Sequence, residues 1–308
     1  MRLDDFDPNI NVEDQRGSGG SGFGGFGGGG GGGLLFAFLP MIFNRFGCFG
    51  VAIVLGLFLV FGGGLNMLGG GGQMIGGGSG APTAASRAGS DTNSSCNLDA
   101  GSKVACNAFS SADKTWAALF AKEGQRFEAP KLVFYNGEGQ SGCGAAQSAM
   151  GPFYCPNDQG IYLDTSFFNE LSQKFGASGD FAQDYVIAHE FGHHIQNLLG
   201  ISDKESALQR RSSEVEGNRL SVMLELQADC FAGVWAAQNR DRMDPGDLQE
   251  GMTAAHAIGD DTLQQETQGR VVPDSFTHGT SQQRMTWLRR GIDTGDYRQC
   301  DTFQGTLG

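Results

Sequence analysis

A long apolar stretch between residues 34 and 68 places the strongest constraint on how this chain can fold. Residues 46–68 carry no charged side chain, and this length reaches the roughly 20 residues that a helix needs to cross a bilayer. A buried core helix is the alternative, but no amphipathic sequence flanks the stretch and glycines follow it. The sequence therefore predicts one transmembrane helix within residues 34–68.

The residues on either side of this segment differ in composition. Gly accounts for 51 of the 308 residues, and most of the excess lies before residue 80. Residues 17–33 are almost entirely Gly with Ser and two Phe, a composition that cannot offset chain entropy by burial. We expect residues 1–33 to form a disordered tail, either a passive spacer or a Gly/Phe interaction segment. Residues 69–99 are expected to form a flexible linker, and residues 100–308 the folded domain.

The flanking charges and the cysteines predict where this domain lies. Arg2, Arg16 and Arg45 precede the uncharged stretch, whereas Arg87 is the nearest cation after it, so the N-terminus is expected in the cytoplasm. A cleaved signal peptide is disfavoured because some 33 hydrophilic residues come first. The sequence predicts a single-pass protein of the inner membrane with a periplasmic or extracellular catalytic domain.

Cysteine usage supports an oxidising compartment. Of seven cysteines, Cys48 lies in the apolar stretch, and the other six could all be paired. The short-range pairs Cys96–Cys106 and Cys143–Cys155 are plausible and leave Cys230 with Cys300, while buried free thiols are the alternative. The formal net charge of -13 argues against nucleic acid as a partner, because no basic field attracts phosphate.

The folded part shows strand patterns first and helix patterns second, which predicts an α+β fold. A helical pattern at 112–123 precedes a small, antiparallel sheet, with residues 137–144 as a Gly-rich loop. Longer helical patterns follow, and Gly291 is expected to end the last of them. The expected strands cover residues 131–135, 150–154 and 160–163, and the later helices cover residues 180–199, 213–238, 247–258 and 281–290.

The sequence His189-Glu190-Phe191-Gly192-His193 lies on the first of the long helices. Residues four apart are one turn above each other, so both imidazoles can reach one metal ion. Glu190 lies beside them and can accept a proton from an attacking water. Polar residues on a solvent-facing helix are the plain alternative. Gly192 weakens a helix, and a close backbone approach would explain its presence.

A catalytic zinc needs a third protein ligand and an open position. Glu225, on the second long helix, is the ligand that we expect. Asp229 lies one turn further on, where it can accept the free N–H of a liganding imidazole and fix its tautomer. Both could instead be surface charges. Zinc is preferred over iron or manganese because a Glu inside this motif indicates water activation rather than oxygen chemistry.

The oxyanion of the reaction requires a further donor besides the metal. His278, in Phe276-Thr277-His278-Gly279-Thr280-Ser281, is the first candidate, and Arg284 one helical turn later is the second. His256 fits ordinary packing or surface better. His194 projects about 100° away from His193 and is expected to be a bystander.

These motifs resemble those of the bacterial "putative neutral zinc metallopeptidase" family. The resemblance rests on the run from Cys143 (C-G-A-A-Q-S-A-M-G-P-F-Y-C-P), then I-Y-L-D, H-E-F-G-H-H, E-L-Q-A-D-C and F-T-H-G-T-S-Q-Q-R, and on N-V-E-D-Q-R near the start. It implies a zincin-like domain with an N-terminal membrane anchor, and His189, His193 and Glu225 as ligands. The pairing of H-E-x-x-H with a later E-x-x-A-D is similar to gluzincin peptidases, and the late His/Arg motif favours His278 and Arg284. The long Gly/Phe tail departs from the family pattern.

The sequence thus predicts a membrane-anchored zinc endopeptidase that acts on peptides or proteins. Two other functions fit the same residues. One is a non-catalytic, chaperone-like module that binds zinc and peptides, although a structural metal needs no base such as Glu190. The other is a zinc amidase that acts on cell-wall material.

Overall fold

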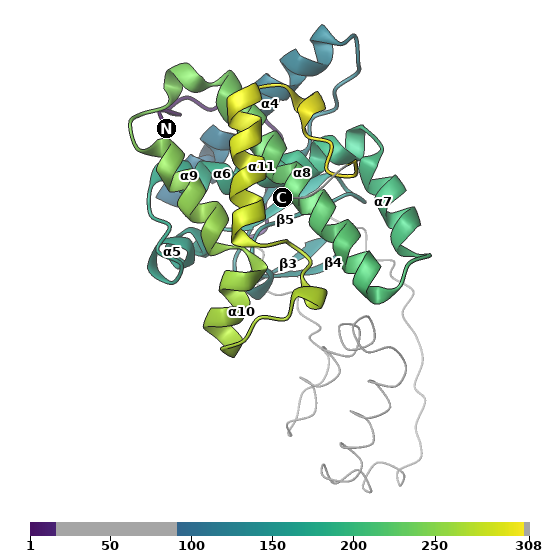
Figure 1. Ribbon diagram of the computed structural model, residues 1–308. Helices are drawn as coiled ribbons and strands as arrows, with labels where there is room; N and C mark the ends of the chain where they lie inside the picture. Colours follow the sequence, from purple (N-terminus) through teal and green to yellow (C-terminus); the bar gives the residue numbers. More distant parts are fainter. Residues whose placement is uncertain (17–90, 305–308) are drawn as a thin grey trace, which may run out of the picture. The chain divides into compact units, whose positions relative to one another are not determined.

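The computed structural model describes residues 1–16 and 91–304, and it confirms the α+β class (Figure 1). Its main sheet has the strand order β1-β2-β6-β5, where β1 is Val12–Asp14, β2 Lys131–Tyr135, β6 Gly160–Asp164 and β5 Phe153–Cys155. β1, β2 and β6 run parallel, and only β5 is antiparallel to its neighbour. The predicted antiparallel pairing is therefore confirmed for β5 with β6 and wrong for β2 with β6, because a long connection lets the chain return in the same direction.

The Gly-rich segment expected to be a loop instead forms a second, two-stranded sheet. Its strands are β3 (Glu138–Ser141) and β4 (Gly144–Gln147), which pair antiparallel. A short 3₁₀ turn over Ser148–Met150 follows, and Gly151 then adopts a φ of 73° before β5 begins. This turn explains why β5 starts later than the predicted residue 150.

Helices make up most of the rest of the domain. The long helices α4, α6 and α8 were predicted in position, although α4 begins twelve residues before the predicted residue 112. Their aromatic side chains Trp116, Phe191 and Phe231 are buried in one core. The helices are α3 Thr92–Cys96, α4 Ala100–Lys122, α5 Ser166–Gln173, α6 Asp180–Leu198, α7 Ile201–Gln209, α8 Glu214–Gln238, α9 Asp247–Ala257, α10 Asp260–Gln268 and α11 Ser281–Thr294.

Glycines allow helix backbones to approach closely at two crossings. A Cβ on Gly192 of α6 would lie 2.9 Å from the carbonyl oxygen of Ala228 on α8, so the expected close approach is confirmed. A Cβ on Gly291 would lie 2.0 Å from the carbonyl oxygen of Cys230. Gly291 therefore packs α11 against α8, side by side in Figure 1, and the prediction that it ends the helix is wrong. Gly295, with a φ of 59°, ends α11 instead.

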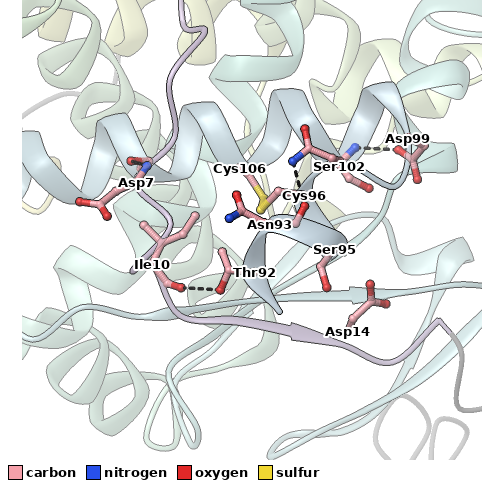
Figure 2. The surroundings of a disulfide bond; sticks show 12 residues. Asp7, Ile10, Asp14, Thr92, Asn93, Ser95, Cys96, Asp99, Ser102 and Cys106 are labelled. Carbon is pink, nitrogen blue, oxygen red and sulfur yellow. Dashed lines mark hydrogen bonds between the residues drawn. A yellow bond between two sulfur atoms is a disulfide. The ribbon is translucent and has the colours of Figure 1, made fainter. Parts of the chain in front are cut away.

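The N-terminal residues belong to the folded domain, so the prediction of a disordered tail is wrong for residues 1–16. Strand β1 pairs with β2, and Thr92 donates a hydrogen bond to the carbonyl of Ile10 (Figure 2). The α-ammonium of Met1 lies 2.8 Å from an oxygen of Asp180. Strand β1 has only three residues and pairs with a distant part of the sequence, so it shows no hydrophobic periodicity from which it could have been predicted.

The predicted start of the folded domain at residue 100 also needs correction. Helix α3 lies within the predicted linker, and its Cys96 is bonded to Cys106 of α4 beside the N-terminal segment (Figure 2). Residues 17–90, which include the predicted membrane segment and most of the predicted linker, lie outside the described residues.

This packing is incompatible with the predicted single-pass topology. Residues 1–16 and 91–304 share one core, so both must lie on the same side of any membrane. A single crossing between them would separate β1 from β2. Within the described residues, only α8 has the length and hydropathy of a membrane span, and it is a core helix, mostly buried in the fold.

The three predicted disulfides are all present. They are Cys96–Cys106, Cys143–Cys155 and Cys230–Cys300. The third joins α8 to the C-terminal segment and closes a loop across 70 residues of sequence. Cross-links over loops of this length can stabilise a fold by several kcal/mol, about 4 kcal/mol in the chain-entropy view.

Candidate metal centre

Two neighbouring helices bring three possible metal ligands together. His189 and His193 project from α6, and Glu225 projects from α8. Nε2 of His189 lies 3.1 Å from one Glu225 oxygen, and Nε2 of His193 lies 3.4 Å from the other. In a tetrahedral zinc site with bonds near 2.1 Å, ligand atoms lie roughly 3.4 Å apart. The spacing of these donors therefore fits zinc.

Each imidazole is held by a hydrogen bond at the nitrogen that faces away from Glu225. Nδ1 of His189 lies 2.8 Å from Asp229 Oδ1, and Nδ1 of His193 lies 2.8 Å from Gln196 Oε1. Carboxylate and amide oxygens can only accept, so both Nδ1 atoms donate and both Nε2 atoms present a lone pair to a metal. Gln196 is itself held by the carbonyl of Leu224 on α8.

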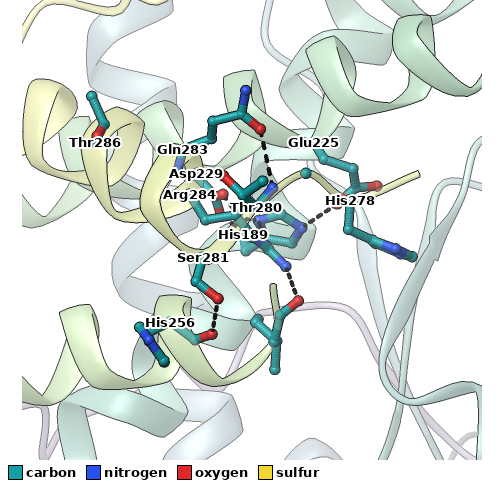
Figure 3. Close-up of polar contacts among 12 residues, drawn as sticks. His189, Glu225, Asp229, His256, His278, Thr280, Ser281, Gln283, Arg284 and Thr286 are labelled. Carbon is teal, nitrogen blue, oxygen red and sulfur yellow. Dashed lines mark hydrogen bonds and ion pairs between the residues drawn. The ribbon is translucent and has the colours of Figure 1, made fainter. Parts of the chain in front are cut away.

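Arg284, which lies beside Asp229 in Figure 3, and Tyr185 complete the surroundings of that carboxylate. The guanidinium of Arg284 donates to both oxygens of Asp229, at 2.8 and 2.9 Å, and Tyr185 Oη donates to one of them at 2.6 Å. All three side chains are buried. Burial alone would raise the pKa of Asp229, but Arg284 and His189 hold it at about 2. Asp229 is thus a fully paired carboxylate.

The electrostatic field at the ligand nitrogens favours a cation. Burial acts to lower the pKa of His189, but Asp229 and Glu225 together raise it to about 10. Glu225 also opposes the effect of burial on His193, whose pKa is raised. Carboxylates that stabilise a proton at these nitrogens also stabilise a metal ion there, so the donor set suits zinc in charge as well as spacing.

Glu190 lies in the same cleft as the candidate ligands. Its side chain is 7% exposed, and burial raises the pKa of its carboxyl group while both motif histidines act against that change. It follows His189 directly on α6, so it comes from the wall that carries the two imidazoles. A carboxylate with a raised pKa in this place is suited to accept and return a proton.

His278 also lines the cleft and is oriented by Asp260. Its Nδ1 lies 3.3 Å from Asp260 Oδ1, while the backbone N–H of His278 donates to the other oxygen at 2.6 Å. The His278 side chain is 51% exposed. Burial lowers and Asp260 raises the pKa of His278, and the net shift is upward. The imidazole is therefore held at the cleft with its charged form favoured.

Arg284 lines the cleft, but its hydrogen bonds point behind the imidazoles. Besides Asp229, it donates to the carbonyl of Ile258 at 3.1 Å and to Tyr185 at 3.3 Å. These contacts fix the guanidinium beside Asp229, on the side of His189 that faces away from Glu225. His256 points away from this group in Figure 3, and His194 binds the carbonyl of Glu128 and the hydroxyl of Tyr154.

The candidate ligands open into a cleft of about 600 Å³. One wall is formed by the residues before and within the edge strand β5, including Pro152, Phe153 and Tyr154. Another wall includes α7, with Ser202, Glu205 and Ser206. His278 and Ile258 lie in the same lining.

Sequence reasoning missed three residues of this site. Tyr185 lies one turn before His189 and Gln196 one turn after His193 on the same helix, so helical spacing could have pointed to both. Asp260 begins another helix, 18 residues before His278, and no local pattern connects the two.

This donor set is typical of zinc-dependent hydrolases. The chain belongs to the family described as "Putative neutral zinc metallopeptidase", whose profile matches residues 1–303. It is 56% identical to "Uncharacterized protein YpfJ" of Escherichia coli K12 over 67% of this chain and 73% of the relative. It is 42% identical to "Uncharacterized protein Rv2575" of Mycobacterium tuberculosis over 63% and 67%. No solved structure matches the chain.

Proposed function

We propose that the protein is a zinc-dependent endopeptidase that uses Glu190 as its general base. The observation that carries this proposal is the convergence of His189, His193 and Glu225 in one cleft with Glu190 beside them. These three side chains would hold the zinc ion. When bound, zinc would polarise the scissile carbonyl and lower the pKa of a water molecule.

The protein's own groups would then move the protons. Glu190 accepts a proton from the attacking water and returns it to the leaving amine, a task that suits its raised pKa. His278, oriented by Asp260, donates a hydrogen bond to the oxyanion. Arg284 does not touch the substrate; it keeps Asp229 in place, and Asp229 keeps His189 in place.

The cleft favours an extended peptide over other amides. β5 is an edge strand of the main sheet and part of the cleft wall. An edge strand offers unpaired backbone N–H and C=O groups, to which an extended peptide can add as a further strand. A cell-wall amidase would account for Glu190 but not for this edge, and a module that binds peptides without cutting them would account for the edge but not for Glu190.

We also propose that the domain works outside the cytoplasm. Three disulfides in one small domain are typical of oxidising compartments. Attachment to the inner membrane through residues 34–68 stays a prediction, with residues 1–16 now in the same compartment as the catalytic domain. A Cys48→Ser variant that keeps the three disulfides and carries one added cysteine, Asn9→Cys or Leu208→Cys, is labelled with an impermeant thiol reagent to test this placement. Labelling at both positions from outside intact inner membranes supports it, and labelling at either from the cytoplasmic side alone contradicts it.

The function is tested with the purified full-length chain. Zinc is removed with a chelator and then restored, and hydrolysis of unfolded casein and of cell-wall material is followed. Casein cleavage that disappears and returns with zinc supports the proposal. Cleavage of cell-wall material alone would favour an amidase, and zinc binding without hydrolysis of either would favour a peptide-binding module.

A further inference from the structure

Helix α7 presents a polar face to the cleft. Ser202, Glu205 and Ser206 all line it, and their spacing of three and four places them on one side of the helix. Asp203, on the same helix, is exposed and is not part of the cleft lining. Ser202, Glu205 and Ser206 are therefore the side chains of α7 that a bound substrate would meet.

Glu205 is a buried carboxylate without a cationic partner. Its side chain is 5% exposed, and its hydrogen-bond contacts are with two neutral groups of its own helix, the Ser206 hydroxyl at 3.5 Å and the side chain of Gln209. Among the residues described here, no Lys, Arg or His nitrogen lies within ion-pair distance of it. A buried charge without a partner is costly, so such groups are usually paired or bind something.

The rest of the cleft does not provide the missing charge. Arg284 is committed to Asp229, and Glu225 is close enough to Glu205 to repel it. Glu170, the other acidic residue of the lining outside the metal centre, already pairs with Lys174 at 3.2 Å. Burial raises the pKa of Glu205, and a cation beside it would reverse that effect.

We infer that Glu205, with the hydroxyls of Ser202 and Ser206, forms a subsite for a basic side chain of the substrate. This inference rests on the proposed function and names its substrate class: peptides with Lys or Arg near the bond to be cut. A guanidinium or ammonium group would pair with the carboxylate, and the hydroxyls would accept its remaining N–H groups. The net charge of -13 would attract such peptides before they bind.

The test uses full-length protein and a set of fluorogenic peptides that differ at one residue on either side of the scissile bond, with Arg, Met or Glu there. At one position we expect wild type to prefer Arg over Met by about tenfold or more in kcat/KM. Glu205→Gln is expected to lower kcat/KM for the Arg peptide about 10- to 100-fold and to change the Met peptide by less than about twofold. Asp203→Asn, which removes a charge from the exposed face of α7, should leave the preference unchanged.

A binding measurement separates this inference from the proposed function. The same peptides are titrated into zinc-loaded Glu190→Gln protein, with and without Glu205→Gln, and followed by fluorescence anisotropy. Tighter binding of the Arg peptide that depends on Glu205 supports the subsite even if wild type cleaves none of the peptides, a result that would count against the peptidase alone. Equal binding of Arg and Met peptides, or an equal loss for both in Glu205→Gln, overturns the subsite.

Discussion

The buried carboxylates on two walls of the cleft differ in whether they have a cationic partner. On the wall formed by α6 and α8, Asp229 accepts hydrogen bonds from Arg284, Tyr185 and His189, and its charge is balanced within the fold. On the wall formed by α7, Glu205 has no cationic partner among the described residues. The difference separates groups that hold the site in shape from a group that is free to bind a ligand. Substitutions of residues that hold the first wall, each compared with a control variant, test this difference.

The largest expected effect comes from Arg284→Met. This change leaves Asp229 buried without its counter-charge, and loss of one partner of a buried pair costs about 3–5 kcal/mol. Urea unfolding of the full-length protein measures the change. Arg289→Met, on the exposed face of the same helix, should cost less than about 1 kcal/mol because its pair with Asp293 is at the surface. Equal losses for the two variants would contradict the role given to Arg284.

Asp229→Asn keeps the shape of the side chain and removes its charge. The amide cannot accept from His189 and Arg284 as the carboxylate does, so zinc affinity should fall about 10- to 100-fold. Competition with a zinc indicator measures it. Glu205→Gln removes a buried carboxylate from the other wall and should change zinc affinity by less than about threefold. Matching losses in both variants would mean that the walls do not differ in the way described.

Gly192→Ala tests how closely α6 and α8 must approach. The added Cβ would lie 2.9 Å from the carbonyl oxygen of Ala228, so the helices must separate, at a cost of about 1–3 kcal/mol, and Glu225 should move from the histidines. Gly217→Ala on α8 is the control, since nothing lies within 4 Å of its added Cβ, and it should stabilise the protein by up to about 1 kcal/mol. Thermal unfolding and zinc content are measured together, and a Gly192→Ala protein with unchanged values would contradict this packing.

The smallest effect is the pH dependence of the pair His278–Asp260. The folded-state pKa of His278 is raised above the usual histidine value of 6.5, so the pair stabilises the protein fully below about pH 6.5 and loses this contribution as pH rises through the folded pKa. The side chain is half exposed, so the stability difference between wild type and His278→Gln should stay below about 1 kcal/mol. That difference should be larger at pH 5.5 than at pH 9 in urea unfolding. A difference that grows with pH would have the wrong sign.

Local sequence patterns predicted the centre of the site and the supporting carboxylate Asp229, but not the rest of the support. Helical spacing placed His189, His193 and Glu225 because each lies in a long amphipathic helix, and a single turn relates Glu225 to Asp229. The partners Asp260 and His278 come from different elements, and their contact depends on how α10 and the following loop pack. The same holds for the strand β1, which pairs with β2 across more than a hundred residues. Composition identified residues 17–33 as unlike a core but could not show that residues 1–16 are part of one.

The central claim is that Glu190 is the base of a zinc-dependent peptidase, and one comparison tests it most directly. Wild-type and Glu190→Gln full-length proteins are loaded with zinc, their zinc content is measured, and their rates of casein cleavage are compared. We predict one zinc ion per chain in both proteins and a cleavage rate about 10²- to 10⁴-fold lower in the variant. Equal cleavage rates at equal zinc content would contradict the account.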